Sequence, residues 1–127
     1  MKIIYIAGPY RAANAWDREQ NIRAAESLAL EVWRMGHAAL CPHTNGRFFD
    51  GVLPDDVFLD GDIVMMLRCD VVLMTPDWRR SAGAVREREV ALAHGIPVCE
   101  SLEDLQRVLA RSRYISTAKF SPQELMP

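Results

Sequence analysis

Short apolar runs alternate along the chain with longer segments of mixed polarity. The apolar runs are rich in Ile, Val and Leu and are the length of strands buried on both faces of a sheet, at residues 3–7, 38–41, 70–74 and 96–99. The segments between them have helical composition or spacing, at residues 14–35, 55–67, 81–94 and 102–111. Gly36 and Gly95 follow two of these segments, where glycine commonly ends a helix.

This alternation predicts the fold class. Strands that alternate with helices favour an α/β fold with a mostly parallel sheet covered on both faces. We therefore expect a single-domain three-layer sandwich, flavodoxin- or Rossmann-like, with a sheet of about four to five strands. The domain should span residues 1–111. Residues 112–127 show no firm pattern and are predicted to be a C-terminal tail, either a short extra strand or an oligomerisation arm.

Two segments are harder to place. The segment at 43–54 is polar and has no period, and loops of this length in compact domains are often functional. The helix expected at 55–67 offers five apolar side chains for burial: Val57, Phe58, Ile63, Val64 and Leu67.

Charge and hydropathy narrow the classes of partner. The 127 residues carry a formal net charge of -2, which gives no electrostatic attraction to a nucleic acid polymer or an anionic membrane. No segment approaches the roughly 18 apolar residues of a membrane span, and the first residues lack a signal-peptide pattern. We therefore expect a cytoplasmic protein that acts on a small molecule.

The cysteines and histidines do not indicate a metal site. Cys41, Cys69 and Cys99 are widely spaced and form no CxxC motif, so they are predicted to be free thiols in a reducing compartment. The three histidines are too dispersed for metal-ligand spacing. We expect no metal and no cofactor.

Ligands of such sheets bind beyond the carboxyl ends of the strands, so the residues that follow each strand are the candidates. Gly8 and Pro9, with Arg11 shortly after, follow the first strand, and a glycine there allows close approach of a ligand. This is not a GxGxxG motif, and a plain turn explains it equally well. His43 and Asn45 follow the second strand, where ordinary turn chemistry is the alternative.

The most specific segment follows the third strand and runs from residue 77 to residue 87. Ser81 and Gly83 at a helix start offer a hydroxyl and free backbone N–H groups to an anion. Glu87 lies nearly two turns into that helix. The alternatives are that Ser81 only caps the helix and that Glu87 is a solvated carboxylate. Asp62 lies beside apolar neighbours, which suggests an acid that is either exposed or held for a purpose.

Taken in order, these segments resemble those of the nucleoside 2-deoxyribosyltransferase-like superfamily. The matching set contains residues 4–9, residues 42–45, Asp62 with Asp70 eight residues on, and residues 81–87. The likeness covers roughly residues 3–100. It is strongest to small uncharacterised bacterial and phage members and more distant to the 2′-deoxynucleoside 5′-phosphate N-hydrolases.

The resemblance implies a role for each matching residue. Glu87 would attack the anomeric carbon of the sugar, Tyr5 would orient that carboxylate, and Asp62 would bind sugar hydroxyls or assist proton transfer. Ser81 and Gly83 would hold the 5′ end of a nucleoside or nucleotide. The expected activity is cleavage or transfer of an N-glycosidic bond, in a homo-oligomer whose sites include residues of a neighbouring subunit.

Several points stay open at this stage. Pro9 replaces a serine of the phosphate hydrolases, which removes a hydroxyl and an N–H donor. Glu89 is the alternative nucleophile, and His43 is the reserve acid. Trp78 is a candidate for stacking on a base. A nucleotide-binding sensor that does no chemistry is the main alternative function, and a plain interaction protein that docks through its tail is a third.

Overall fold

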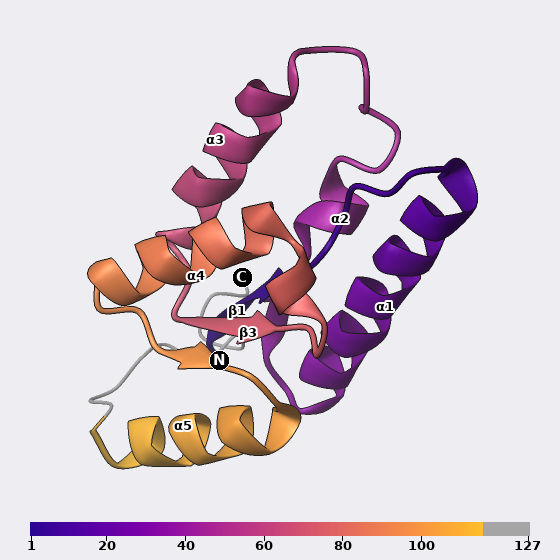
Figure 1. The fold of residues 1–127 in the computed structure, drawn as a ribbon. Coiled ribbons are helices and arrows are strands. Elements are labelled where there is room, and N and C mark those ends of the chain that lie inside the picture. The colour runs from indigo at the N-terminus through magenta and orange to yellow at the C-terminus, as the bar shows by residue number, and fades with distance from the viewer. Residues whose placement is uncertain (116–127) are drawn as a thin grey trace, which may run out of the picture.

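The computed structural model describes residues 1–115, with side chains up to residue 111, and it is an α/β fold (Figure 1). Four parallel strands form one sheet in the order β2-β1-β3-β4. The strands are β1 (Ile3–Ala7), β2 (Ala38–Leu40), β3 (Val71–Met74) and β4 (Val98–Cys99). The predicted three-layer α/β sandwich with a parallel sheet is therefore confirmed.

Helices cover both faces of this sheet. They are α1 (Ala15–Arg34), α2 (Pro42–Asn45), α3 (Asp55–Met66), α4 (Ala82–Ala93) and α5 (Leu102–Ile115), with a 3-10 turn η1 at Trp78–Arg80. Helices α1 and α5 pack on one face, and α3 and α4 pack on the other. In Figure 1, α4 and α5 lie on opposite sides of the strands.

The pleat of β1 divides the core into two halves. Ile4 and Ile6 point towards α1 and α5, whereas Tyr5 and Ala7 point towards α3 and α4. All four residues are completely buried, as expected for a strand in the middle of a parallel sheet. Tyr5 is therefore a polar side chain in an otherwise apolar strand, and its hydroxyl requires a partner on the α4 side.

The chain reverses its direction of travel across the sheet between β1 and β3. It moves from β1 to β2 on one side, then crosses back to place β3 on the other side of β1. Parallel sheets bind ligands at such a switch point, in the crevice beyond the carboxyl ends of the strands. The two strand ends are tied there, because the N–H of Thr75 donates to the carbonyl of Ala7 at 2.8 Å.

The structure corrects several predicted elements. Residues 42–45 form the short helix α2, where we expected the start of a loop, and β4 has two residues in place of four. The last helix continues to Ile115, into the segment that the sequence left unpatterned. In α3, Met66 is buried, whereas Val57 and Val64 are about half exposed, so the burial expected of those two valines was wrong.

One further finding concerns Asp70 at the amino end of the sheet, and another concerns whether any helix could cross a membrane. The carboxylate of Asp70 accepts a hydrogen bond from the N–H of Ile3 at 2.8 Å, which is a structural role at the amino end of the sheet. Within residues 1–115, no helix combines the length and the apolar character that crossing a bilayer requires.

Candidate active site

A cavity of about 550 Å³ lies at the switch point, and four segments of the chain form its walls. The segments are the loop after β1, α2 with the loop that follows it, one side of α3, and the start of α4 with the residues just before it. The lining residues predicted from the sequence are Gly8, Pro9, Arg11, His43, Asn45, Asp62, Ser81, Gly83 and Glu87.

Glu87 and Tyr5 form the polar centre of this cavity. The Tyr5 hydroxyl donates a short hydrogen bond to Oε2 of Glu87. Tyr5 is itself completely buried behind the cavity wall, so it reaches any ligand only through Glu87. The second carboxylate oxygen, Oε1, has no hydrogen-bond partner among the described residues and is free to act on a ligand.

The sequence of α4 explains why Glu87 faces inwards. Ser81 caps the helix, and its Oγ accepts from the N–H of Ala84 at 3.1 Å. Ala84 and Ala91 are buried against the sheet. Glu87 lies between them at helical spacing, so it shares their face. Glu89 is exposed and does not line the cavity, which disfavours the alternative register.

Asp62 supplies a second carboxylate from the opposite wall. It lies one turn before Met66 on α3, and Met66 is completely buried against the sheet. Burial raises the pKa of Asp62 to about 6. At neutral pH this group therefore holds its proton far more often than an ordinary aspartate does.

The environment also raises the pKa of Glu87. Burial is the main cause, and the charge of Asp62 adds to it, while the Tyr5 hydrogen bond and Arg86 act in the opposite direction. The net result is a pKa of about 7. The pKa of Tyr5 is raised well above its usual value by burial and by Glu87, so its hydroxyl stays a donor.

His43 is buried and holds the backbone of the first loop. Its Nε2 lies 3.1 Å from the carbonyl of Gly8 and 2.8 Å from that of Pro9, and a carbonyl can only accept, so Nε2 carries the proton. Burial also lowers the pKa of His43. The imidazole is therefore neutral with its N–H engaged, which argues against its reserve role as a general acid.

Trp78 does not lie where the sequence analysis suggested. It is buried outside the cavity, and its indole N–H donates to Glu100 at 3.0 Å. The guanidinium groups of Arg79 and Arg88 lie 4.5 and 4.9 Å from its ring centroid. Its ring is packed within the fold and is not available to a ligand, so stacking of Trp78 on a base is not supported.

The structure adds lining residues that the sequence did not single out. Phe49 and Phe58 stack on each other with ring centroids 6.3 Å apart and form an aromatic wall. Arg80 lines the cavity and donates to Asp77 and Asn21. Phe49 lies in the aperiodic segment 43–54, whose length was its only signal of function, and Phe58 lies in α3, where the sequence indicated burial and not a ligand.

The two cavity arginines are already paired. Nη2 of Arg11 lies 2.7 Å from the carboxylate of Asp55, and Nη2 of Arg80 lies 2.7 Å from that of Asp77. All four side chains are largely exposed, so these pairs orient the loops more than they stabilise the fold. Asn45 is exposed and Gly83 is half-buried, and both line the cavity where a ligand can reach them.

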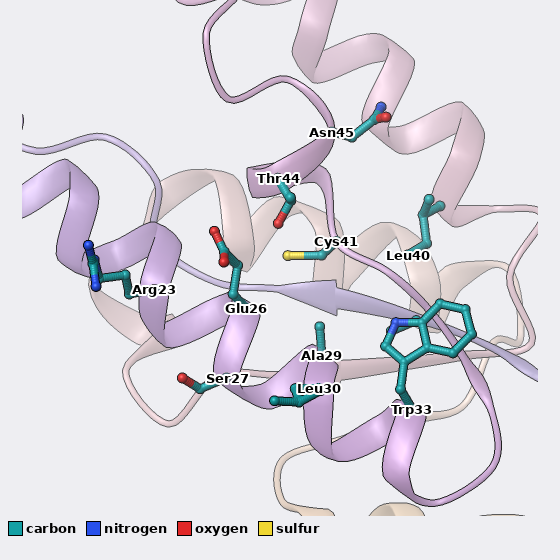
Figure 2. A pocket seen from close by; sticks show the side chains of 11 residues that line it. Arg23, Glu26, Ser27, Ala29, Leu30, Trp33, Leu40, Cys41, Thr44 and Asn45 are labelled. Carbon is teal, nitrogen blue, oxygen red and sulfur yellow. The ribbon is translucent and has the colours of Figure 1, made fainter.

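A second, more open hollow lies between α1 and the edge strand β2 (Figure 2). The side chains of Glu26, Thr44 and Cys41 point towards one another there, and Leu30 and Trp33 form its apolar side. Burial raises the pKa of the Cys41 thiol, so it is a poor nucleophile. The paired acids of the first cavity have no counterpart in this hollow.

Comparison with known proteins places the chain in a family without giving it an activity. A family profile described as a domain of unknown function, DUF4406, matches residues 2–100. The chain belongs to this family. The matched region contains all four strands and every residue that lines the cavity. No curated protein matches the chain.

Proposed function

We propose that this DUF4406 protein cleaves the N-glycosidic bond of a nucleoside or nucleotide, with Glu87 as the nucleophile. The observation that carries the proposal is the Tyr5–Glu87 pair, which faces a ligand-sized cavity opposite Asp62. Two carboxylates with raised pKa values in one cavity are typical of functional sites. The resemblance to the nucleoside 2-deoxyribosyltransferase-like superfamily supports the same assignment.

In the first step, Oε1 of Glu87 attacks the anomeric carbon C1′. A C1′–O bond forms as the C1′–N bond breaks, and the electron pair of the broken bond goes to the base. Asp62 donates its proton to the departing base. Positive charge builds on the sugar in the transition state, and the adjacent carboxylate stabilises it. The hydrogen bond from Tyr5 holds Oε2 and thereby aims Oε1.

In the second step, an acceptor attacks C1′ and the ester to Glu87 breaks. The electron pair of the ester bond returns to Glu87 and restores its carboxylate. The ionised Asp62 takes the proton of the acceptor and is ready for another turnover. A water molecule as acceptor gives hydrolysis, and a second base gives transfer.

The walls of the cavity fit the two halves of such a substrate. The Phe49–Phe58 wall offers an apolar surface for a flat base. At the start of α4, Ser81 and the backbone N–H groups around Gly83 offer donors to the hydroxyl or phosphate at the 5′ end of the sugar.

The test is chromatographic detection of a released base. The protein is incubated with ribo- and deoxyribonucleosides and their 5′-monophosphates, with and without a free acceptor base. Release by the wild type, and its loss in Glu87→Gln, supports the proposal. Glu89→Gln is the matched control, because that carboxylate is exposed on the same helix. It should retain activity.

Two outcomes would contradict the mechanism. Full activity of Glu87→Gln would exclude Glu87 as the nucleophile. Binding of a nucleoside or nucleotide without release of any base would favour the alternative, a sensor of the same fold. Asp62→Asn tests the acid separately, because it should slow release most for substrates whose base is a poor leaving group.

A further inference from the structure

Apart from Tyr5 and Trp78, three polar side chains are buried among residues 1–111, and all three border the loop that follows β1. They are Asn21 at 8% exposure, His43 at 5% and Thr75 at 2%. Buried polar groups in a small domain normally have a specific task, because each must be hydrogen-bonded to offset its loss of hydration. Here they come from α1, α2 and the end of β3, and they converge on residues 8–11, which we call loop 1.

The carbonyl oxygens of loop 1 are held in sequence by two of these side chains. Nε2 of His43 donates to the carbonyls of Gly8 and Pro9, at 3.1 and 2.8 Å. Nδ2 of Asn21 donates to the carbonyls of Tyr10 and Arg11, at 3.2 and 3.4 Å. Four consecutive carbonyls are thus fixed by donors from two different helices.

The orientation of the carbonyls determines where the amide groups point. All peptide bonds of the described residues are trans, so the N–H of each peptide points opposite to its C=O. The N–H groups of Tyr10 and Arg11 therefore point away from His43 and Asn21. Neither has a hydrogen-bond partner within residues 1–115, although both residues line the cavity.

The floor of loop 1 is fixed from a third direction. A Cβ on Gly8 would lie 2.4 Å from Oγ1 of Thr75, so the loop rests directly on the residue that follows β3. Asn21 has one more contact, since its Oδ1 accepts from Nη2 of Arg80 at 2.8 Å. The same amide therefore joins loop 1 to the loop after β3.

From these contacts we infer that His43 and Asn21 are positioning residues that hold loop 1 in its ligand-binding conformation. They act through the backbone of the loop, which keeps the N–H groups of Tyr10 and Arg11 available as donors to a ligand. The inference rests on the proposed function for the identity of that ligand. It assigns His43 a role in binding through loop 1, distinct from the chemistry of Glu87.

The variants distinguish the loss of a hydrogen-bond donor from a change in the shape of the side chain. His43→Phe keeps a ring and removes the donor, whereas His43→Gln places an amide N–H near the position of Nε2. Asn21→Asp is nearly isosteric, keeps an acceptor for Arg80 and loses the donor to loop 1. Thus His43→Gln is the conservative rescue, and the other two remove the contact under test.

Two measurements apply to every variant. Backbone 15N relaxation gives NMR order parameters for the amides of Gly8, Tyr10 and Arg11, with the amides of β3 as reference. We expect the order parameters of loop 1 to fall from about 0.85 to below about 0.6 in His43→Phe and Asn21→Asp, and to stay close to wild type in His43→Gln. In His43→Phe and Asn21→Asp, base-release kinetics should show KM raised about tenfold and kcat within about threefold of the wild type, because substrate binding is weakened and the chemical step is not.

The two readouts keep this inference separate from the proposed function. If the wild type releases no base, the proposed function fails and the order parameters of loop 1 alone decide the inference. Unchanged order parameters in His43→Phe and Asn21→Asp would overturn the inference. It would also be overturned by order parameters that fall equally in β3, or by a loss of kcat at unchanged KM, since these indicate a general structural defect or a direct catalytic role.

Discussion

Tyr5→Phe removes a single oxygen atom from a side chain whose ring is completely buried in β1. The oxygen donates the hydrogen bond that holds Oε2 of Glu87, and this bond lowers the pKa of that carboxyl against the effect of burial. Without it, the pKa of Glu87 should rise above about 7, and less of the nucleophile should be ionised at neutral pH.

The size of the effect follows from the type of hydrogen bond. A hydrogen bond to a charged group contributes about 1.5–3 kcal/mol, and 1.36 kcal/mol corresponds to one pKa unit, so the pKa of Glu87 should rise by about one to two units. At pH 7 the ionised fraction then falls from about one half to between about 1% and 10%. We expect kcat/KM to fall about five- to fiftyfold at this pH.

The assay is base release measured from pH 5 to pH 9 for the wild type and the variant. In the wild type, activity should rise as Glu87 ionises near pH 7 and fall as Asp62 loses its proton near pH 6, so the profile is a narrow bell between these values. In Tyr5→Phe the rising limb shifts to higher pH. The ratio of wild-type to variant activity should therefore shrink to about one- to twofold by pH 9.

Two results would refute this reasoning. A ratio that stays constant from pH 5 to pH 9 would show that Tyr5 does not act through the ionisation of Glu87. Equal activities at pH 7 would show that the hydrogen bond has no part in the reaction. Circular dichroism and thermal unfolding of the variant check that a lower activity is not caused by loss of the fold.

Three further predictions concern stability and binding. Glu87→Gln should be inactive yet more stable than the wild type at pH 8, by about 3 kcal/mol in urea unfolding, because the pKa of Glu87 in the folded protein is about 7 against a usual 4.5. The wild type loses stability as pH rises through this range, so the difference in stability between the two proteins should vanish near pH 4.5. Gly8→Ala should lower the free energy of unfolding by about 1–3 kcal/mol, because its Cβ would clash with buried Thr75; an unchanged urea midpoint would contradict this. Phe49→Ala should raise KM for base release severalfold, whereas Phe48→Ala, outside the cavity and more exposed, should leave it unchanged; equal effects would exclude an aromatic wall for the base.

The sequence predicted those parts of the structure that depend on short-range patterns. The run at residues 3–7 identified β1 because every position is apolar or aromatic and residues 4–7 are buried, and the cap at Ser81 and the spacing of Ala84 and Ala91 account for α4. Once both elements are in place, the parallel arrangement brings Tyr5 next to Glu87. The strand ends named in advance as ligand-binding positions do line the cavity.

The parts that the sequence did not predict depend on contacts between distant segments. The segment at 43–54 has no period, so neither helix α2 nor the Phe49–Phe58 stack could be read from it. Trp78 follows a strand end just as a ligand-binding residue would, and only its burial against distant core residues shows that it packs inwards. The role of Asn21 depends on carbonyls ten and eleven residues earlier in the chain.

The same burial that stabilises the sheet also sets the chemistry of the site. Tyr5 occupies the middle of a strand where an apolar residue would pack equally well, and it lies there with its hydroxyl against Glu87. Burial raises the pKa of Glu87 and of Asp62 to about 7 and about 6, so the two groups share their protons near neutral pH at a cost to stability. Carboxylates held at such a cost cluster at functional sites. This cost is the physical reason to look first for an enzyme in this fold.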